Sequence, residues 1–308
     1  MVSVTSVVTK GGDKIMLNRG WKTVPDYTVP SLFMIGRNNS TPTTSSTGLD
    51  TPIPITDGTL IDPGSNSFTG SLGGTNTTSN TSLYKPGMSL SDNTGQNLLA
   101  NGSSVSKVWT KTGLTNNFVT TKPFGLWLYI KDSTTLAKFK SSSTALEIRI
   151  GSDASNYYYR TFTASTLTTG WNWITSNTTL VSALSTVGTP GGTLNTFIIV
   201  ITTNNATDTF AAPTNPTAEV VYDMARQWAS TDTQKAFVSG YPSIDEVNMI
   251  VEIRGYIVST EMNGFDFNSV ALKNTDGTPI VSDIDVFSPA ESKSDTDEFS
   301  IILKNQLS

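Results

Sequence analysis

The sequence predicts an all-β protein, and three observations support this class. Short apolar runs alternate with a period of two, as in strands that have one buried face. Turn-forming residues separate these runs at regular intervals. Only 15% of the 308 residues are charged, and Ser, Thr, Asn and Gly take their place, which is typical of short strands joined by many turns. A hydrophobic share of 36%, with six Trp and nine Tyr, is sufficient for a packed core and argues against disorder.

The first sixty residues are predicted to hold short extended pieces. The chain opens with the strand-like run "MVSVTSVVT", and the prolines at positions 25 and 30 restrict the residues around them to short segments. Residues 37–82 are rich in Pro, Thr, Gly and Ser, so we expect them to run over a surface in extended form. Within this stretch, 61–83 is predicted to be a Gly/Ser/Thr-rich linker.

The middle of the chain, 84–244, is predicted to be a domain of its own. The run "FIIVI" at 197–201 is apolar on both faces, which predicts a central strand covered on each side. One helical turn is expected at 178–188, and little else has a helical pattern. The predicted strands of this domain are 105–111, 124–131, 145–151, 157–163, 171–176, 195–203 and 218–228.

The closing residues, 245–308, return to long alternating strands. Asp276-Gly277 lies between two apolar runs and predicts a hairpin turn. These strands have no obvious partners in the middle of the chain, so we expect them to pair with the strands of 1–60. The two chain ends would then form one small discontinuous β domain, with 84–244 inserted at a surface loop.

The composition excludes several classes of function. The net charge of −5 argues against binding to nucleic-acid phosphates. Cysteine and histidine are both absent, which removes disulfides, thiolate chemistry, the commonest general base and the commonest metal ligand. No nucleophile elbow, P-loop or dinucleotide fingerprint is present. The start of the chain does not read as a secretory signal, and no apolar run approaches the ~20 residues of a membrane helix. We therefore expect neither an enzyme nor membrane insertion.

Two neighbouring stretches carry unexpected side chains on the face that should be polar. In "FGLWLYIKD" and in "ALEIRIGSDASNYYYRTF", alternation places aromatic and charged residues opposite the core-facing leucines and isoleucines. If the two strands pair, these side chains form one surface. It could stack on a sugar ring and bond its hydroxyls, or it could be covered by loops or a neighbouring subunit, and the second alternative is favoured. The surface would consist of Trp127, Tyr129, Glu147, Arg149 and Tyr158.

The two ends of the chain carry a recognisable pattern. The leading segment reads "LNRGWKTVPDYTVPSLFMIGRNNSTPTTSSTGLDTPIPI", and the closing segment contains "VALKNTDGTPIVSDIDVFSPAESKSDTDEFSIILK". Together they resemble the start and end of virion structural proteins of tailed bacteriophages. The middle, with "FGLWLYIKD", "GWNWI" and "VVYDMARQW", resembles the jelly roll of galactose-binding-like domains and carbohydrate-binding modules. That resemblance implies a two-sheet sandwich inserted into the terminal β domain, although many such domains bind no sugar.

Acidic residues near strand ends are the remaining candidates for a bound group. Oxygen ligands suit calcium, and jelly rolls of the resembled class often hold a structural calcium ion. The carboxylates are scattered, however, and duties in turns and caps explain them more simply. We therefore expect no cofactor, with structural calcium as the alternative. The candidates are Asp132, Asp153, Asp208 and Asp223.

The resemblance implies a structural component of the virion, assembled in the host cytoplasm. Capsid decoration, neck or collar, baseplate and tail fibre all remain open. The terminal domain would anchor the chain, and its partners would be other virion proteins and copies of itself, arranged as a homo-oligomer by the symmetry of the particle. One alternative is an adhesin whose jelly roll binds host-surface glycan. Another is a glycan-active enzyme or its accessory binding module.

Overall fold

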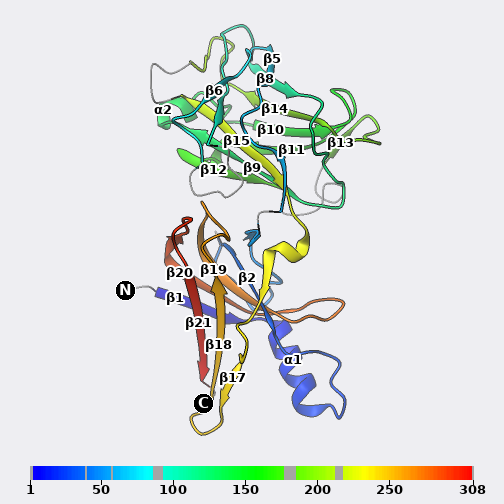
Figure 1. Cartoon of the computed structure of the whole chain (residues 1–308), viewed down its shortest axis with the longest axis vertical. Helices are drawn as coiled ribbons and strands as arrows, with labels where there is room; N and C mark the ends of the chain where they lie inside the picture. The colour runs from blue at the N-terminus through cyan, green and yellow to red at the C-terminus, as the bar shows by residue number, and fades with distance from the viewer. Residues whose placement is uncertain are drawn as a thin grey trace. The chain divides into compact units, whose positions relative to one another are not determined.

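The computed structural model describes most of the chain and divides it into two compact units (Figure 1). The chain is 45% strand and 8% helix and its sheets are antiparallel, so the predicted all-β class is confirmed. Unit 1 comprises Met1–Asp57, Gly87–Ser89 and Ser230–Ser308, and unit 2 comprises Gly58–Pro86 and Leu90–Ala229. The described residues are 3–38, 40–56, 58–85, 93–176, 185–211 and 218–306.

Unit 1 is built on a sheet that joins the two ends of the chain. Strand β1 pairs with β20 from Ser3↔Ser288 to Val8↔Asp283, and β2 pairs with β19. The closing strands therefore pair with the N-terminal strands, as predicted. The predicted Asp276-Gly277 hairpin connects β19 to β20, which pair with each other. The sheet order is β1 (Ser3–Val8), β20 (Val281–Ser292), β19 (Asp266–Lys273), β2 (Leu32–Arg37) and β16 (Gln234–Ala236), with β3 (Thr51–Pro52) beside β2.

A second, three-stranded sheet packs on the first through aromatic rings. It consists of β17 (Ser243–Asp245), β18 (Ile250–Ile257) and β21 (Phe299–Gln306). A Cβ atom at Gly255 of β18 would lie 2.9 Å from the ring of Phe33, so glycine at this position lets the strand backbone rest on that ring. Phe267 and Phe299 meet edge to face with 5.3 Å between their ring centroids.

The helix α1 (Lys10–Trp21) of unit 1 was not predicted from the sequence. The Thr9 hydroxyl caps its first turn by accepting a hydrogen bond from the Gly12 amide at 3.1 Å. A side chain at Gly12 would collide with the carbonyl oxygen of Ser282, so glycine allows the helix to begin directly against β20. Gly12 and Ile15 are its buried residues. Three glycines and a single large buried side chain leave no helical periodicity to detect.

Unit 2 is a sandwich of two sheets. All seven predicted strands are confirmed, with ends that differ from the prediction by at most two residues. One sheet has the order β13 (Ser185–Val187), β11 (Tyr157–Thr163), β10 (Thr144–Gly151), β14 (Thr196–Thr202), β8 (Ser106–Lys111) and β5 (Thr69–Leu72). The other has the order β12 (Gly170–Thr175), β9 (Phe124–Ile130), β15 (Val220–Gln227), β7 (Gly95–Asn97) and β6 (Thr78–Asn80), with β4 (Thr59–Asp62) beside β15.

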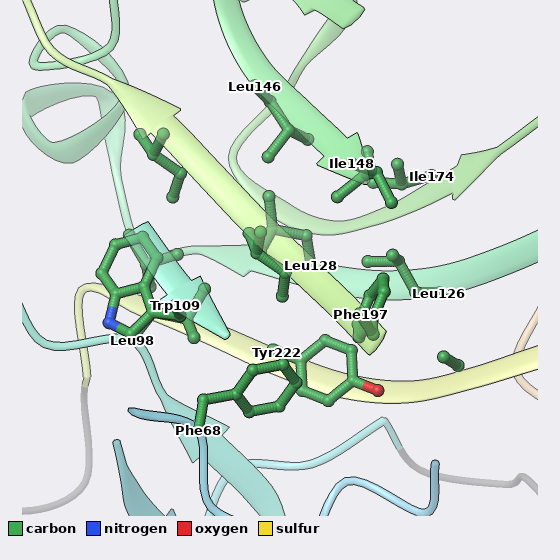
Figure 2. Packing of buried hydrophobic residues seen from close by; sticks show 14 of the residues in the cluster. Phe68, Leu98, Trp109, Leu126, Leu128, Leu146, Ile148, Ile174, Phe197 and Tyr222 are labelled. Carbon is green, nitrogen blue, oxygen red and sulfur yellow. The ribbon is translucent and has the colours of Figure 1, made fainter. Parts of the chain in front are cut away.

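The inner faces of these two sheets enclose a continuous apolar core, shown in Figure 2. The predicted central strand is confirmed, because β14 lies between β10 and β8 and is buried from Thr196 to Ile201. Phe68 and Tyr222 meet edge to face at 5.1 Å. The fully buried indole of Trp109 donates hydrogen bonds to the carbonyl oxygens of Thr75 at 3.1 Å and Leu99 at 3.0 Å, so its polar atom is satisfied inside the core.

The predicted linker at 61–83 is wrong, because this stretch supplies β5, β6 and the end of β4 to unit 2. These strands are polar, and buried side-chain hydrogen bonds fix them in place of apolar alternation. Thr77 donates to Gln96 and Asn80 donates to Asn97, each at 2.8 Å. A pattern search for hydrophobic periodicity does not detect strands of this kind.

The predicted end of the inserted domain at 244 is also too late. Residues from Ser230 onward belong to unit 1, where the 3₁₀ turn η2 (Ser230–Thr233) leads into β16 and then β17. The helical turn expected at 178–188 falls largely on 177–184, which lie outside the described residues, and Ser185–Val187 form strand β13. The jelly-roll connectivity of unit 2 stays a prediction.

Candidate functional site

The predicted surface is divided between two faces of unit 2. Strand β9 pairs with β12 and β15, whereas β10 pairs with β11 and β14. The condition for a single surface, that β9 and β10 pair, is therefore not met. Leu128 of β9 and Ile148 of β10 enter the same core from different sheets (Figure 2), so the alternate residues of these strands lie on opposite outer faces. Alternation identifies the buried face of a strand but not the strand with which it pairs.

The outer face of β9 and β12 carries an aromatic ladder. Trp127 lies opposite Trp173, and their ring centroids are 4.9 Å apart. Tyr129 lies opposite Trp171 at 5.3 Å, and Trp228 stacks on Trp173 at 5.7 Å. The sequence analysis missed Trp171 and Trp173, although the spacing in "GWNWI" places both on the same face of a strand.

Half of this ladder is closed to a ligand. Trp127 is 4% exposed, and the Lys85 ammonium lies 4.3 Å from the centroid of its ring. The buried guanidinium of Arg226 lies 5.2 Å from the ring of Trp173. These rings are packed against cations. Tyr129, Trp171 and Trp173 are all half-buried. Because the Arg226 guanidinium lies against the ring of Trp173, the pair Tyr129 and Trp171 is the candidate contact surface of the ladder.

The charged half of the predicted surface lies on the other sheet. Glu147 and Arg149 of β10 form an ion pair, and the Arg149 guanidinium lies 4.8 Å from the centroid of the Tyr157 ring. Glu147 is opposite Val200 and Arg149 is opposite Ile198 on β14, and both apolar residues are buried. The long charged side chains therefore lie beside apolar surface, and each carries its own counter-ion.

Tyr158 lies on the inner face, which corrects the prediction. It is opposite Ile150 in the β10–β11 pair and packs against the core of unit 2. Three consecutive tyrosines, Tyr157 to Tyr159, follow the turn between these strands. Because their side chains are alike, the sequence pattern cannot tell which of them points inward.

Local hydrogen bonds engage each of the calcium candidates. Asp132 caps the short helix α2 (Ser133–Leu136) by accepting from the Thr135 amide at 2.7 Å, and this bond lowers the pKa of Asp132. Buried Asp223 accepts from the Lys85 amide at 2.6 Å. Within the described ranges, no group of three or more Asp and Glu side chains could hold a metal ion. The other two candidates, Asp153 and Asp208, accept backbone hydrogen bonds in exposed turns.

One buried carboxylate of unit 2 has a perturbed pKa. Burial raises the pKa of Asp62, while hydrogen bonds from Asn66 at 2.9 Å and from the Tyr222 hydroxyl at 2.8 Å act in the opposite direction. Burial also holds the pKa of Tyr222 well above its usual value, so this phenol remains a donor at neutral pH. The Asp62–Tyr222 hydrogen bond joins β4 to β15 inside the sandwich. Because the buried carboxylate is hydrogen-bonded, we assign the pair a structural role in the core.

Exposed apolar side chains concentrate in unit 1. Of the fifteen exposed large hydrophobic residues in the part of the chain that the structure describes, eleven belong to unit 1 and four to unit 2. Unit 1 is also acidic, with 17 acidic and 10 basic residues, whereas unit 2 has 8 acidic and 10 basic residues. The eleven are Val4, Val8, Met16, Leu17, Trp21, Val24, Val29, Ile244, Val247, Met249 and Ile302.

Comparison with known proteins gives no assignment. No protein-family model matches the chain, and no curated protein matches it. No helix in the described residues is long and apolar enough to cross a membrane.

Proposed function

We propose that this chain is a structural component of a tailed-bacteriophage virion. It acts by assembling with copies of itself and with other virion proteins. The observation that carries this proposal is the concentration of exposed apolar side chains in unit 1. Covering an exposed apolar side chain is worth up to about 1.5–3 kcal/mol, so a surface with many of them favours a protein partner.

The pattern of the chain ends supports the same proposal. The segments that resemble virion proteins lie mostly in Met1–Asp57 and Ser230–Ser308, which fold together as unit 1. The part of the chain that resembles assembly proteins is therefore the part with the exposed apolar surface. Unit 2 is inserted between these segments and encloses its own core, so we assign the anchoring contacts to unit 1.

Electron microscopy of labelled particles tests this proposal. Antibody raised against the full chain is applied to purified virus particles, with pre-immune serum as the control. Label at fixed positions is the expected result, and head or tail placement then identifies the substructure. Particles without label, in a preparation where the same antibody detects the purified chain, would overturn the proposal.

Glycan binding by unit 2 is a second candidate, favoured by the accessible pair Tyr129 and Trp171. An aromatic pair at 5.3 Å on a sheet face offers a stacking surface. Retention on a glycan array, lost in Trp171→Ala and kept in Val187→Ala, would support this candidate. Absence of retention by the wild-type chain on host polysaccharide would leave assembly as the function.

A further inference from the structure

A groove runs beside helix α1 in unit 1. The segment after the helix folds back along it, because Arg19 donates to the Tyr27 carbonyl oxygen at 2.9 Å and the Asp26 amide donates to Asn18 at 2.7 Å. The hollow between them has a volume of 560 Å³. We call it the α1 groove, and its lining is Lys10, Asp13, Lys14, Leu17, Asn18, Lys22, Asp26 and Tyr27.

The lining of the α1 groove combines Leu17 and Tyr27 with three lysines and two aspartates, of which Lys22 and Asp26 form an ion pair. Leu17 is 64% exposed, and the Lys14 ammonium lies 5.1 Å from the centroid of the Tyr27 ring. Lys10, Lys14 and Leu17 follow one another at spacings of four and three, which places them on one face of the helix. Buried Gly12 and Ile15 lie on the opposite face, so this face is turned away from the core of the unit. Residues 10–22 hold four basic residues and one acidic residue, within a unit that is acidic as a whole.

The hairpin between β17 and β18 has the opposite character. Its residues 244–249 read "IDEVNM" and include two acidic residues and no basic one. Ile244 is 67% exposed, Val247 is 91% exposed and Met249 is 52% exposed. The Asp245 carboxylate fixes the turn by accepting from the Val247 amide at 3.0 Å and the Asn248 amide at 3.1 Å. We call residues 244–249 the hairpin tip.

These two surfaces are complementary in both charge and apolarity. The tip presents Val247 with Glu246 beside it, and the groove presents Leu17 with Lys10 and Lys14 beside it. The tip side chains remain exposed, so the tip does not fill the groove of its own chain. Each copy therefore carries one hairpin tip and one α1 groove that do not fill each other.

We propose that the hairpin tip of one copy docks into the α1 groove of a second copy, an inference that rests on the proposed self-assembly. Val247 enters the groove against Leu17 and Tyr27, and Glu246 meets the lysines of its lining. The two halves differ, so two copies can exchange the contact reciprocally in a closed dimer, or each copy can extend it head-to-tail to the next copy in a ring or a filament.

A charge exchange in the full chain tests this contact, with the dissociation constant of self-association measured by light scattering. Lys10→Glu and Glu246→Lys are each expected to weaken association by about tenfold, and the double variant to recover most of the loss. Glutamate is favoured in the first turn of a helix, and position 246 lies in an exposed turn, so both chains are expected to fold. Circular dichroism checks this.

A matched apolar pair completes the test. Val247→Ser is expected to weaken association by at least about tenfold, whereas Leu72→Ser, at a 66% exposed position of unit 2, leaves it unchanged. If the wild-type chain associates and none of the groove or tip variants alters its association, the docking contact is wrong and self-assembly stands. A wild-type chain that stays monomeric at all concentrations contradicts both the docking contact and self-assembly. The virion role is then decided separately by labelling of particles.

Discussion

Unit 2 buries its large apolar side chains between two sheets and leaves four exposed, whereas unit 1 leaves eleven exposed on a smaller, more acidic body. Both units are made of antiparallel strands from the same chain, so the fold class does not explain the difference. The sandwich provides each strand of unit 2 with an inner face. In unit 1, α1 buries Gly12 and Ile15 and exposes its other large apolar side chains, and the turn between β17 and β18 exposes Val247 and Met249. Unit 2 encloses its own core, and the exposed apolar side chains of unit 1 support the proposal that a partner covers them.

The largest expected effect comes from a pair of tryptophans, one in each unit. Trp109 is fully buried in unit 2, and Trp21 is 87% exposed in unit 1. Trp109→Ala should lower the free energy of unfolding by about 3–5 kcal/mol, because it opens a cavity and removes the indole hydrogen bonds to the carbonyl oxygens of Thr75 and Leu99. Trp21→Ala should change it by less than about 0.5 kcal/mol. Urea unfolding measures both, and equal losses would contradict the comparison.

A smaller, pH-dependent effect is expected at the Asp62–Tyr222 pair. Tyr222→Phe removes a donor from a buried carboxylate and should cost about 1.5–3 kcal/mol at pH 7. The pKa of Asp62 in the folded chain is raised above 3.8, so the folded state holds this proton more tightly than the unfolded state. The stability that Asp62 contributes is therefore present below pH 3.8 and is lost as pH rises from 3.8 through the raised pKa. Removing the Tyr222 donor destabilises the charged carboxylate and makes this loss larger.

Unfolding of Tyr222→Phe at two pH values measures this dependence. The penalty at pH 7 should exceed the penalty at pH 4, where Asp62 is more protonated. Asn66→Ala, which removes the other side-chain donor to Asp62, should show the same sign. A penalty independent of pH would contradict the assignment of the raised pKa.

Two glycines of α1 should respond to alanine in opposite directions. A Cβ at Gly12 would collide with the Ser282 carbonyl oxygen, whereas a Cβ at Gly20 would meet nothing within 4 Å. Gly12→Ala should therefore destabilise unit 1 by about 1–3 kcal/mol, and Gly20→Ala should stabilise it by up to about 1 kcal/mol. Thermal unfolding of the two variants side by side compares them, and destabilisation by both would argue against the described helix.

The smallest effect on stability, and the sharpest contrast in association, is expected from two leucines. Leu17 of unit 1 and Leu72 of unit 2 are 64% and 66% exposed. Serine at either position should change the free energy of unfolding by less than about 0.5 kcal/mol. Only Leu17→Ser should weaken self-association, as read by light scattering. An equal effect of both variants on association would remove the distinction between the units.

The sequence was sufficient to predict much of the fold and little of the site. Apolar alternation located the seven strands of unit 2, and the unpaired closing strands indicated that the chain ends fold together. Alternation carries no information about the partner of a strand, which is why the residues of β9 and β10 could be combined into a surface that the structure divides. The three consecutive tyrosines left the inward residue undetermined, and Tyr158 was placed on the wrong face. The polar strands β5 and β6 and the glycine-rich helix α1 depend on buried hydrogen bonds and close backbone contact, and neither leaves a hydrophobic period.

Of the two surfaces in the proposed docking contact, the sequence could have indicated the hairpin tip. The run "DEVNM" at 245–249 places two acids and turn residues at the start of the closing strands expected from 245 onward, and the strand β18 begins at Ile250. The exposure of Val247 is a consequence of this turn, which the alternating pattern obscured. By contrast, the basic face of α1 could not be recognised before the helix itself was known.

Hydrogen exchange of the full chain at low and high protein concentration distinguishes an assembling unit 1 from a self-contained unit 2. Raising the concentration is expected to slow exchange in peptides covering Lys10–Tyr27 and residues 243–249 of unit 1. Peptides from β9, β12 and β14 of unit 2 should exchange at the same rate at both concentrations. Slowing confined to the outer faces of unit 2, or no slowing in unit 1, would contradict the division between a self-contained unit and an assembling one.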